Sequence, residues 1–232
     1  METLSTAIIT AAGSGSRMGG NVRKQWLKLG GIPIIIHTLQ RFFTSEYIDN
    51  IIITAPEDEQ DYCQNMVREY FEDFEKPWLV VPGGFERQDS VFSALQNCPP
   101  RTEYVFIHDA VRPFITEELL GELFEMVKKS KAAVPVARLK NTIKSIEQDH
   151  ILETIPRHKL VQAFTPQVFS YRLIMAAYER AYQEGFISTD DSSLVEYHGA
   201  KVSYKFCSDL NIKITDEVDL FFAQQILDNN LI

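Results

Sequence analysis

Short apolar runs alternate with longer amphipathic segments along most of the chain. The short runs, such as IIIT and VFIH, contain few polar residues, which is typical of strands covered on both faces of a sheet. They predict strands at Thr6–Thr10, Ile51–Ala55, Leu79–Val81, Tyr104–His108, Ala132–Val136 and Val202–Phe206. The pattern between them predicts helices near Ile34–Phe43, Glu57–Phe74, Arg87–Gln96, Glu117–Lys129 and Tyr171–Glu184.

This alternation predicts an α/β fold with a doubly wound, mostly parallel, Rossmann-like sheet built by right-handed crossovers. The 232 residues suffice for one domain, so we expect residues 1–232 to form a single unit. Ligands of such sheets bind beyond the carboxyl ends of the strands. The loops after Thr10, Val81, His108 and Val136 are therefore the first places to look for a site.

One segment departs from the alternation of strands and helices. Residues 141–156, NTIKSIEQDHILETIP, read as two extended runs around a polar turn at Gln148–His150. This predicts a β-hairpin arm, at about residues 138–160, inserted into the α/β fold. Because an isolated two-stranded hairpin is only marginally stable in water, we expect the arm to pack on a second subunit. An ordinary surface excursion is the alternative.

Composition excludes several classes of protein. No apolar stretch approaches the roughly 20 residues of a membrane span, and the first residues, METLST, lack the features of a signal peptide. We therefore expect a cytoplasmic protein that binds no membrane. Cys63, Cys98 and Cys207 form no CxxC pair, so neither a disulfide nor a cysteine metal site is expected.

The distribution of charge is more informative than the net charge. A net charge of −9 argues against nucleic-acid binding, which needs a basic face. Between Glu2 and Glu46, however, the chain carries five cations and no acid, so this segment has a charge of +5 and the remainder −14. A local positive field in an acidic protein favours a small polyanionic ligand, although a chance run of solvated cations gives the same pattern.

The glycine-rich segment Gly13–Met18 follows the first predicted strand and is compatible with three phosphate-binding loops. A Walker A loop requires GxxxxGK[ST], which is absent. A dinucleotide fingerprint requires a glycine where Met18 stands and an acid about 20 residues later, but none occurs before Glu46. A nicotinamide oxidoreductase is therefore disfavoured.

The third interpretation is a loop that holds a nucleoside triphosphate under attack. Glycines let backbone N–H groups approach phosphate oxygens, and Arg17 and Lys24 supply cations that stabilise a departing pyrophosphate. Of the neighbours Arg23 and Lys24, we expect Lys24 to enter the site. Spacing alone does not separate this loop from a plain strand-to-helix turn with exposed cations.

Two later loops carry further candidate chemistry. In VPGGFERQDSV, Gly83 and Gly84 follow a strand, and Arg87 and Ser90 lie one helical turn apart, an arrangement that can hold a base edge. In IHDAVRP, Asp109 at a strand end suits a ribose hydroxyl or a magnesium-bound phosphate. The preceding residue, His108, is expected to face the core, because the other histidines show no metal-ligand spacing.

Taken in order, six motifs resemble the 2-C-methyl-D-erythritol 4-phosphate cytidylyltransferase family. They are AAGSGSRMG followed by KQ, GGxxRxxSV, HDAVRP, LVQAFTPQVF, STDDSSLVEY and NIKIT, from about Ala7 to Thr215. The resemblance implies a cytosolic homodimer of the non-mevalonate isoprenoid pathway. It would transfer the cytidylyl group of CTP to methylerythritol phosphate and release pyrophosphate, with Mg²⁺ or another divalent cation.

The resemblance also implies roles for individual residues. The catalytic residues would be Arg17, Lys24, Arg157 and Lys213. The nucleotide would be bound by Ala11, Ala12, Gly13, Gly15, Gly84, Arg87, Ser90, Asp109 and Ala110, with Asp109 also next to the metal. Methylerythritol phosphate would be bound by Arg112, Thr142, Arg157, Thr165, Thr189 and Lys213. Thr142 and Arg157 lie on the predicted arm, which in the family exchanges across the dimer, so Arg157 would reach the neighbour's site.

Two alternatives remain at this stage. The sibling ribitol-5-phosphate cytidylyltransferases share most of these loops but typically read Ala-Gly-Gly where this chain has Ala-Ala-Gly at 11–13. A nucleotide-binding regulatory module without turnover is the other, against which the cations Arg17, Lys24 and Lys213 argue. Pyrophosphate release with each sugar phosphate separates these possibilities.

Overall fold

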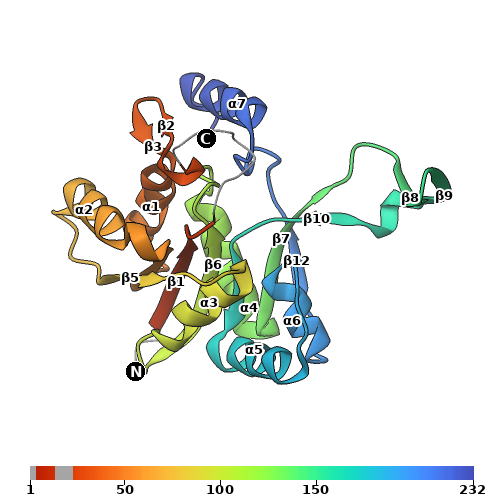
Figure 1. Ribbon diagram of the computed structural model, residues 1–232, viewed down its shortest axis with the longest axis horizontal. Coiled ribbons are helices and arrows are strands. Elements are labelled where there is room, and N and C mark those ends of the chain that lie inside the picture. Colours follow the sequence, from red (N-terminus) through yellow and green to blue (C-terminus); the bar gives the residue numbers. More distant parts are fainter. Residues whose placement is uncertain (1–3, 14–22) are drawn as a thin grey trace.

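The structure is a computed structural model that describes residues 4–13 and 23–232. Its centre is a sheet in the order β10-β7-β11-β6-β1-β4-β5, with β12 on the other edge of β7 (Figure 1). These strands are β1 (Leu4–Thr10), β4 (Asn50–Ala55), β5 (Trp78–Pro82), β6 (Thr102–Asp109), β7 (Ala132–Arg138), β10 (Val161–Ala163), β11 (Gln167–Ser170) and β12 (Ser203–Phe206). Two small hairpins lie outside it, β2 (Lys28–Leu29) with β3 (Ile32–Pro33), and β8 (Ile143–Glu147) with β9 (His150–Ile155).

Most of the predicted elements are confirmed. The helices are α1 (Ile34–Thr44), α2 (Gln60–Phe71), α3 (Arg87–Gln96), α4 (Glu117–Ser130), α5 (Tyr171–Glu184), α6 (Asp191–Tyr197) and α7 (Glu217–Asp228). The helix expected over Glu57–Phe74 begins with a separate 3₁₀ turn, Glu57–Glu59, and ends at Phe71. The sequence analysis did not predict β10, β11, α6 or α7.

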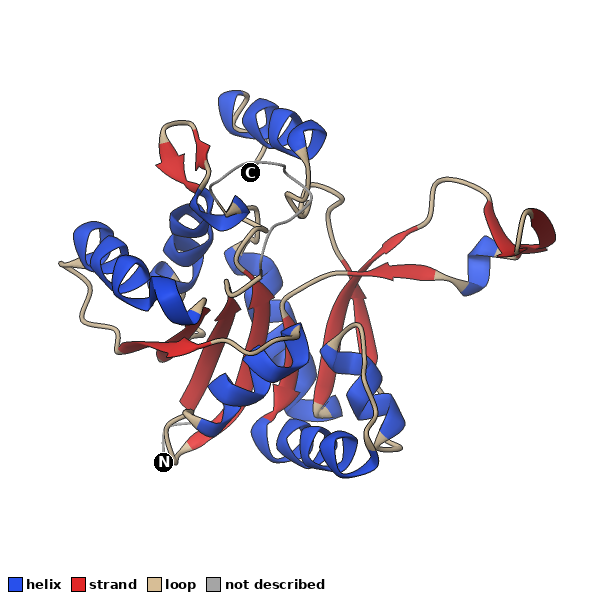
Figure 2. Ribbon diagram, in the orientation of Figure 1, coloured by secondary structure: helices blue, strands red, loops and turns tan. Residues whose placement is uncertain are grey.

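Strand alternation divides the core into two layers, because successive side chains point to opposite faces of the sheet. Ile9 and Ile53 pack with α1, α2 and α4 on one face, whereas Ile8 and Ile52 pack with α3, α5 and α6 on the other. Figure 2 shows helices on both sides of the strands. The continuous apolar strands of the sequence therefore lie where predicted, in a sheet covered on both faces.

The sheet is mostly parallel, as predicted, with antiparallel insertions. The pairs β1–β4, β1–β6, β4–β5 and β7–β12 are parallel. β11 is antiparallel to both β6 and β7, and β10 is antiparallel to β7. The chain between Val161 and Ser170 thus returns along β7 and carries residues 164–166 to the carboxyl end of β6.

The C-terminal part of the chain reaches the same end of the sheet, at the carboxyl end of β6. The N–H of Ile214, a fully buried residue, donates to the carbonyl of Val111 at 2.9 Å. α7 then packs over the β2–β3 hairpin in a third apolar cluster. Its side chain Gln224 accepts a hydrogen bond from the N–H of Gly30 at 2.9 Å. These contacts bring Lys213 beside Asp109, although more than a hundred residues separate the two in sequence.

The predicted hairpin arm is present and projects from the body of the molecule (Figure 1). β8 and β9 pair antiparallel around the turn at 148–149, as expected. Ile146, Ile151 and Leu152 on this arm are 73%, 64% and 66% exposed. The arm therefore carries apolar surface that the described residues of its own chain do not cover.

Candidate active site

A cavity of about 880 Å³ opens at the carboxyl ends of β1, β4, β5 and β6. Its lining comes from the segments that follow Thr10, Val81 and His108, as expected, and from residues 56–58 and Lys213. The loop after Val136, which was also expected to form the site, does not line this cavity. The predicted site residues that line it are Ala11, Ala12, Gly13, Lys24, Gly84, Arg87, Ser90, Asp109 and Lys213. Ala110 is buried beside it, and its carbonyl accepts a hydrogen bond from Thr38 Oγ1 at 2.8 Å. Arg17 and Gly15, both predicted for this site, lie outside the described residues.

The loop after β1 is held by a residue that the sequence analysis missed. The buried side chain of Gln25 donates its amide Nε2 to the carbonyl of Ala11 at 2.6 Å and to that of Gly13 at 3.4 Å. The N–H of Ala11 donates to the Thr54 carbonyl on β4 at 2.9 Å. Gln25 stands directly after Lys24 in the quoted KQ motif, so its position in sequence was the available signal.

The loop after β5 needs its glycines for close packing. A Cβ on Gly83 would lie 2.1 Å from the Ala12 Cβ, and one on Gly84 would lie 2.1 Å from the Asp89 Cβ. Ser90 Oγ accepts the N–H of Gly84 at 3.0 Å and donates to the Glu86 carbonyl at 3.2 Å. Ser90 therefore fixes the loop that lines the cavity.

Arg23, which stands beside Lys24 in the sequence, pairs with two acidic side chains. Its Nε lies 3.1 Å from Glu59 Oε2 and its Nη2 lies 3.3 Å from Asp58 Oδ1. Trp26 Nε1 donates to the same Glu59 oxygen at 2.7 Å. These contacts tie Arg23 to the 3₁₀ turn after β4, and Arg23 and Lys24 both line the cavity. The expectation that Lys24 rather than Arg23 acts in the site therefore stays a prediction.

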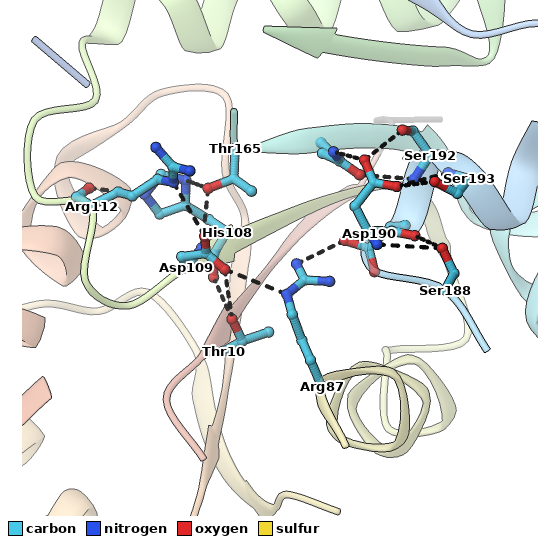
Figure 3. A network of polar contacts seen from close by, with 12 residues as sticks. Thr10, Arg87, His108, Asp109, Arg112, Thr165, Ser188, Asp190, Ser192 and Ser193 are labelled. Atoms are coloured by element: carbon cyan, nitrogen blue, oxygen red, sulfur yellow. Dashed lines mark hydrogen bonds and ion pairs between the residues drawn. The ribbon is translucent and has the colours of Figure 1, made fainter. Parts of the chain in front are cut away.

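Asp109, at the end of β6, is the centre of a charged cluster (Figure 3). Its Oδ2 lies 2.9 Å from Lys213 Nζ and 3.1 Å from Arg112 Nε, and its Oδ1 lies 3.4 Å from Arg87 Nε. The Asp109 side chain is 7% exposed. Thr10 Oγ1 adds a hydrogen bond to Oδ1 at 3.5 Å. One nearly buried carboxylate thus holds three cations from different parts of the chain.

This environment decides the charge of two neighbouring groups. Burial opposes ionisation of Asp109, but Arg87, Lys213 and Arg112 outweigh it and hold the pKa of Asp109 well below its ordinary value. Burial lowers the pKa of His108 to about 4. Asp109 is therefore an anion and His108 neutral at pH 7. The prediction that His108 faces the core is confirmed, since it is fully buried.

A second cavity of about 280 Å³ lies on the other side of this cluster. Three residues, Arg87, Asp109 and Lys213, line both cavities, and we call them the charged wall. The other predicted residues in the second cavity are Arg112, Thr165 and Thr189.

Hydrogen bonds among three segments of the chain hold the second cavity in place. Thr165 Oγ1 accepts the N–H of Asp109 at 3.2 Å and lies 3.0 Å from His108 Nδ1. Arg112 Nη1 donates to the Asn211 carbonyl at 2.9 Å, and Asn211 Nδ2 donates to the Thr165 carbonyl at 2.9 Å. The segments 109–112, 164–166 and 211–214 are thereby locked together around the wall.

The STDDSS motif supplies a half-buried acid, Asp190, and a buried one, Asp191, to which the sequence analysis assigned no role. Asp190 caps α6 and accepts hydrogen bonds from Gln167, Ser192 and Ser193 (Figure 3). Asp191, which is fully buried, accepts Arg87 Nη2 at 2.8 Å. An acid before an apolar run signals a helix N-cap, but nothing local in sequence indicates that the next acid pairs with Arg87.

Thr142 and Arg157 are the predicted site residues that the structure does not bring to either cavity. Both are exposed on the arm, and Arg157 Nη1 donates to the Lys140 carbonyl at 2.7 Å. Neither lines the two cavities described above. Within one chain, therefore, Arg157 and Thr142 lie apart from the other predicted residues.

The residues that the structure describes include free thiols but neither a metal-ligand cluster nor a helix that could span a membrane. No group of three or more His, Cys, Asp or Glu side chains could hold a metal ion there. Cys63, Cys98 and Cys207 are free thiols. No helix in this part of the chain is long and apolar enough to cross a membrane.

Comparison with known proteins identifies the family. Residues 5–229 match the family model described as IspD, 2-C-methyl-D-erythritol 4-phosphate cytidylyltransferase. Proteins of that name from Geotalea uraniireducens and Bacillus thuringiensis are 42% and 39% identical to this chain, each over 96% of it and over 96% and 97% of their own lengths.

Two solved structures are similar to this chain over nearly its whole length. The 4-diphosphocytidyl-2C-methyl-D-erythritol synthase from Anaerococcus prevotii has a TM-score of 0.86 at 33% identity, with 97% of this chain and 96% of that one covered. The 2-C-methyl-D-erythritol 4-phosphate cytidylyltransferase of Francisella tularensis has a TM-score of 0.82 at 28% identity, with 96% and 99% covered. This chain belongs to the 2-C-methyl-D-erythritol 4-phosphate cytidylyltransferase family.

Proposed function

We propose that this chain transfers the cytidylyl group of CTP to 2-C-methyl-D-erythritol 4-phosphate and releases pyrophosphate, as a step of isoprenoid precursor synthesis. The observation that carries the proposal is the charged wall, which lines two cavities at once. A large cavity suits a nucleoside triphosphate, and the smaller one suits a sugar phosphate. Two anionic substrates can then meet across Arg87 and Lys213.

The chemistry explains why the site is dominated by cations. A phosphate oxygen of methylerythritol phosphate attacks the α-phosphorus of CTP, and the bond from that phosphorus to the bridging oxygen breaks. The bonding electrons leave with pyrophosphate. The attacking phosphate is already an anion at pH 7, so the protein must align the reactants and neutralise charge, and no general base is required.

The proposed roles follow the two cavities. CTP occupies the first, held by the loops at Ala11, Ala12, Gly13, Gly15, Gly84 and Ser90 with Asp109, and with Ala110 behind it. Arg17 and Lys24 hold its phosphates, and Arg87, a residue of the charged wall, lies between CTP and the second substrate. Methylerythritol phosphate occupies the second cavity beside Arg112, Thr165 and Thr189, and Lys213 positions its phosphate.

The described residues suit Mg²⁺ only as a partner of the nucleotide. Mg²⁺ is commonly held by one or two carboxylates together with substrate phosphates and water, and Asp109 is the one predicted carboxylate between the cavities. We propose that Asp109 contributes a single oxygen to a cation carried mainly by CTP phosphates. The cation would offset charge that develops on the phosphates.

The arm and the compartment complete the proposal. Apolar side chains on both strands of the arm are exposed, and an isolated hairpin is marginal without a partner surface. We propose a homodimer in which Thr142 and Arg157 of one copy complete the second cavity of the other. The cytoplasm is the proposed location, and neither nucleic acid nor membrane is a proposed partner.

Pyrophosphate release with CTP and each sugar phosphate tests the function. We expect turnover with 2-C-methyl-D-erythritol 4-phosphate and Mg²⁺, little with ribitol 5-phosphate, and none after EDTA. Phosphorus NMR of the product should show a new diphosphate linkage. Turnover with ribitol 5-phosphate alone would overturn the substrate assignment, and CTP binding without release from either would indicate a regulatory module.

A further inference from the structure

Arg87 lies between two carboxylates and divides its guanidinium between them. Its Nη2 is 2.8 Å from Asp191 Oδ2, whereas its Nε is 3.4 Å from Asp109 Oδ1. The closer partner is Asp191, which is fully buried behind the wall. Figure 3 shows Arg87 extending from its helix toward Asp109. The stronger contact therefore draws Arg87 away from the carboxylate that faces the cavities.

Asp191 is itself held by a second buried residue. Tyr178, in the middle of α5, is fully buried, and its hydroxyl donates to Asp191 Oδ1 at 2.5 Å. Burial first, and then the charge of Asp191, keep the pKa of Tyr178 well above its ordinary value, so this hydroxyl stays protonated and donates. The Tyr178 ring stacks against Phe92 of α3, the helix that carries Arg87.

Because Arg87 pairs with both Asp191 and Asp109, its position also affects the cations at the other carboxylate oxygen of Asp109, Oδ2. Asp109 Oδ2 is shared by Lys213 and Arg112, at 2.9 and 3.1 Å. If Asp191 did not hold Arg87, the guanidinium would turn to Asp109 and compete with Lys213 for it, because a carboxylate attracts a guanidinium as a bidentate partner. Lys213 would then leave the position between the two cavities.

We propose that Asp191 and Tyr178 are positioning residues for the transfer reaction, which hold Arg87 so that Asp109 keeps Lys213 in place between the two substrates. The inference rests on the proposed function. Neither residue lines the two cavities, so their effect passes through Arg87.

Tyr178→Phe removes the hydroxyl and keeps the ring. We expect kcat to fall about tenfold, the effect of one hydrogen bond to a charged group, while KM for CTP and methylerythritol phosphate stays within a factor of about two. Tyr171→Phe is the matched control, because Tyr171 lies on the same helix and its hydroxyl donates to the Leu95 carbonyl at 3.1 Å. Its kcat should match that of the wild type.

A second variant and a double-mutant cycle separate positioning from folding. Asp191→Asn removes the charge at nearly the same size, and we expect a drop in kcat of about 100-fold with the near-UV circular dichroism retained. In an Arg87→Ala background, Tyr178→Phe should have no further effect on kcat, since residues that act through one group are not additive.

Three outcomes would overturn the inference: an unchanged kcat in Tyr178→Phe, an equal drop in Tyr171→Phe, or the full drop in the Arg87→Ala background. Wild-type protein that fails to release pyrophosphate from CTP and methylerythritol phosphate would instead count against the proposed function. The two failures are therefore distinguishable in one set of assays.

Discussion

The charged wall and the hairpin arm hold their residues in opposite ways. In the wall, Asp109 is 7% exposed and contacts three cations, of which Arg87 and Lys213 come from distant segments. On the arm, Ile151 and Leu152 are 64% and 66% exposed, and Arg157 contacts a carbonyl of the arm's own base. The wall is positioned by packing and pairing within one chain, whereas the arm presents exposed side chains to its surroundings.

This difference separates two kinds of functional residue. A side chain in a buried network has its geometry set by folding, so its removal affects both chemistry and stability. A side chain on an exposed arm affects chemistry only if a second copy brings it to a site. The predictions that follow test this contrast, beginning with the largest expected effect.

Lys213→Ala removes one cation of the charged wall and should strongly reduce turnover. One cation that stabilises developing charge is worth about 100- to 1000-fold in kcat, so pyrophosphate release should fall by that factor. Lys140→Ala is the matched control, because Lys140 also forms an ion pair, with Asp209 at 2.6 Å, but both partners are exposed. Retained activity in Lys213→Ala would remove Lys213 from the catalytic assignment.

Acidification should lower the free energy of unfolding of the protein, because His108 is neutral and buried in the folded state. Its pKa is about 4 in the folded protein and about 6.5 in an unfolded chain. Below pH 6.5 the unfolded chain takes up a proton that the folded protein does not, so stability is complete above pH 6.5 and falls as the pH approaches 4. The expected loss is about 3 kcal/mol, measured by urea unfolding.

The variant His108→Gln provides the control for this titration. It keeps a polar side chain near Thr165 and the Arg112 carbonyl but cannot titrate, so its stability should depend less on pH between 6.5 and 4.5. Asp109 contributes a loss only below about pH 4, where protonation of a carboxylate with a depressed pKa begins to cost stability. Equal pH dependence in both proteins would contradict the assignment to His108.

Arg157→Ala should reduce turnover about 10- to 100-fold, as expected for loss of one charged contact to a phosphate, with unfolding free energy changed by less than about 0.5 kcal/mol. If the proposed homodimer forms, mixing Arg157→Ala chains with Lys24→Ala chains should restore turnover, because each mixed dimer would hold one site with both cations. Lys159→Ala, on the same exposed 3₁₀ turn, is the control. Failure to complement, with subunit exchange verified, would place Arg157 outside a shared site.

Local pattern was sufficient for much of the fold. The helices at Arg87–Gln96 and Tyr171–Glu184 have the predicted bounds, because each has a clear apolar face and is set off by strand or turn residues. β10 and β11 were missed because they are short and join antiparallel to strands far away in sequence. α7 was missed although Asp216 and Asp219 form a capping box at its start.

The site residues likewise fall into those that local sequence indicates and those that it does not. Glycine loops, strand-end acids and basic residues are visible in the sequence, and the structure brings Lys24, Arg87, Asp109, Arg112, Thr165, Thr189 and Lys213 to the two cavities. The partners Asn211, Asp191 and Tyr178 give no local signal, whereas Gln25 stands in the KQ motif and supports its own loop. Asn211 contacts Thr165, 46 residues away, and Asp191 contacts Arg87, 104 residues away. Tyr178 acts through Asp191, 13 residues further along the chain.

By itself, the sequence determined the strand–helix alternation, the end of the sheet at which the two cavities open, and the residue types suited to phosphate chemistry. These follow from hydrophobic period and local chemistry, which act over a few residues. Only the tertiary structure decided that one carboxylate, Asp109, joins Arg87 and Lys213 into a wall between two cavities and also pairs with Arg112. That arrangement depends on the insertion of β11 and on the docking of Ile214 against Val111, since burial and pairing energies arise only when distant segments meet.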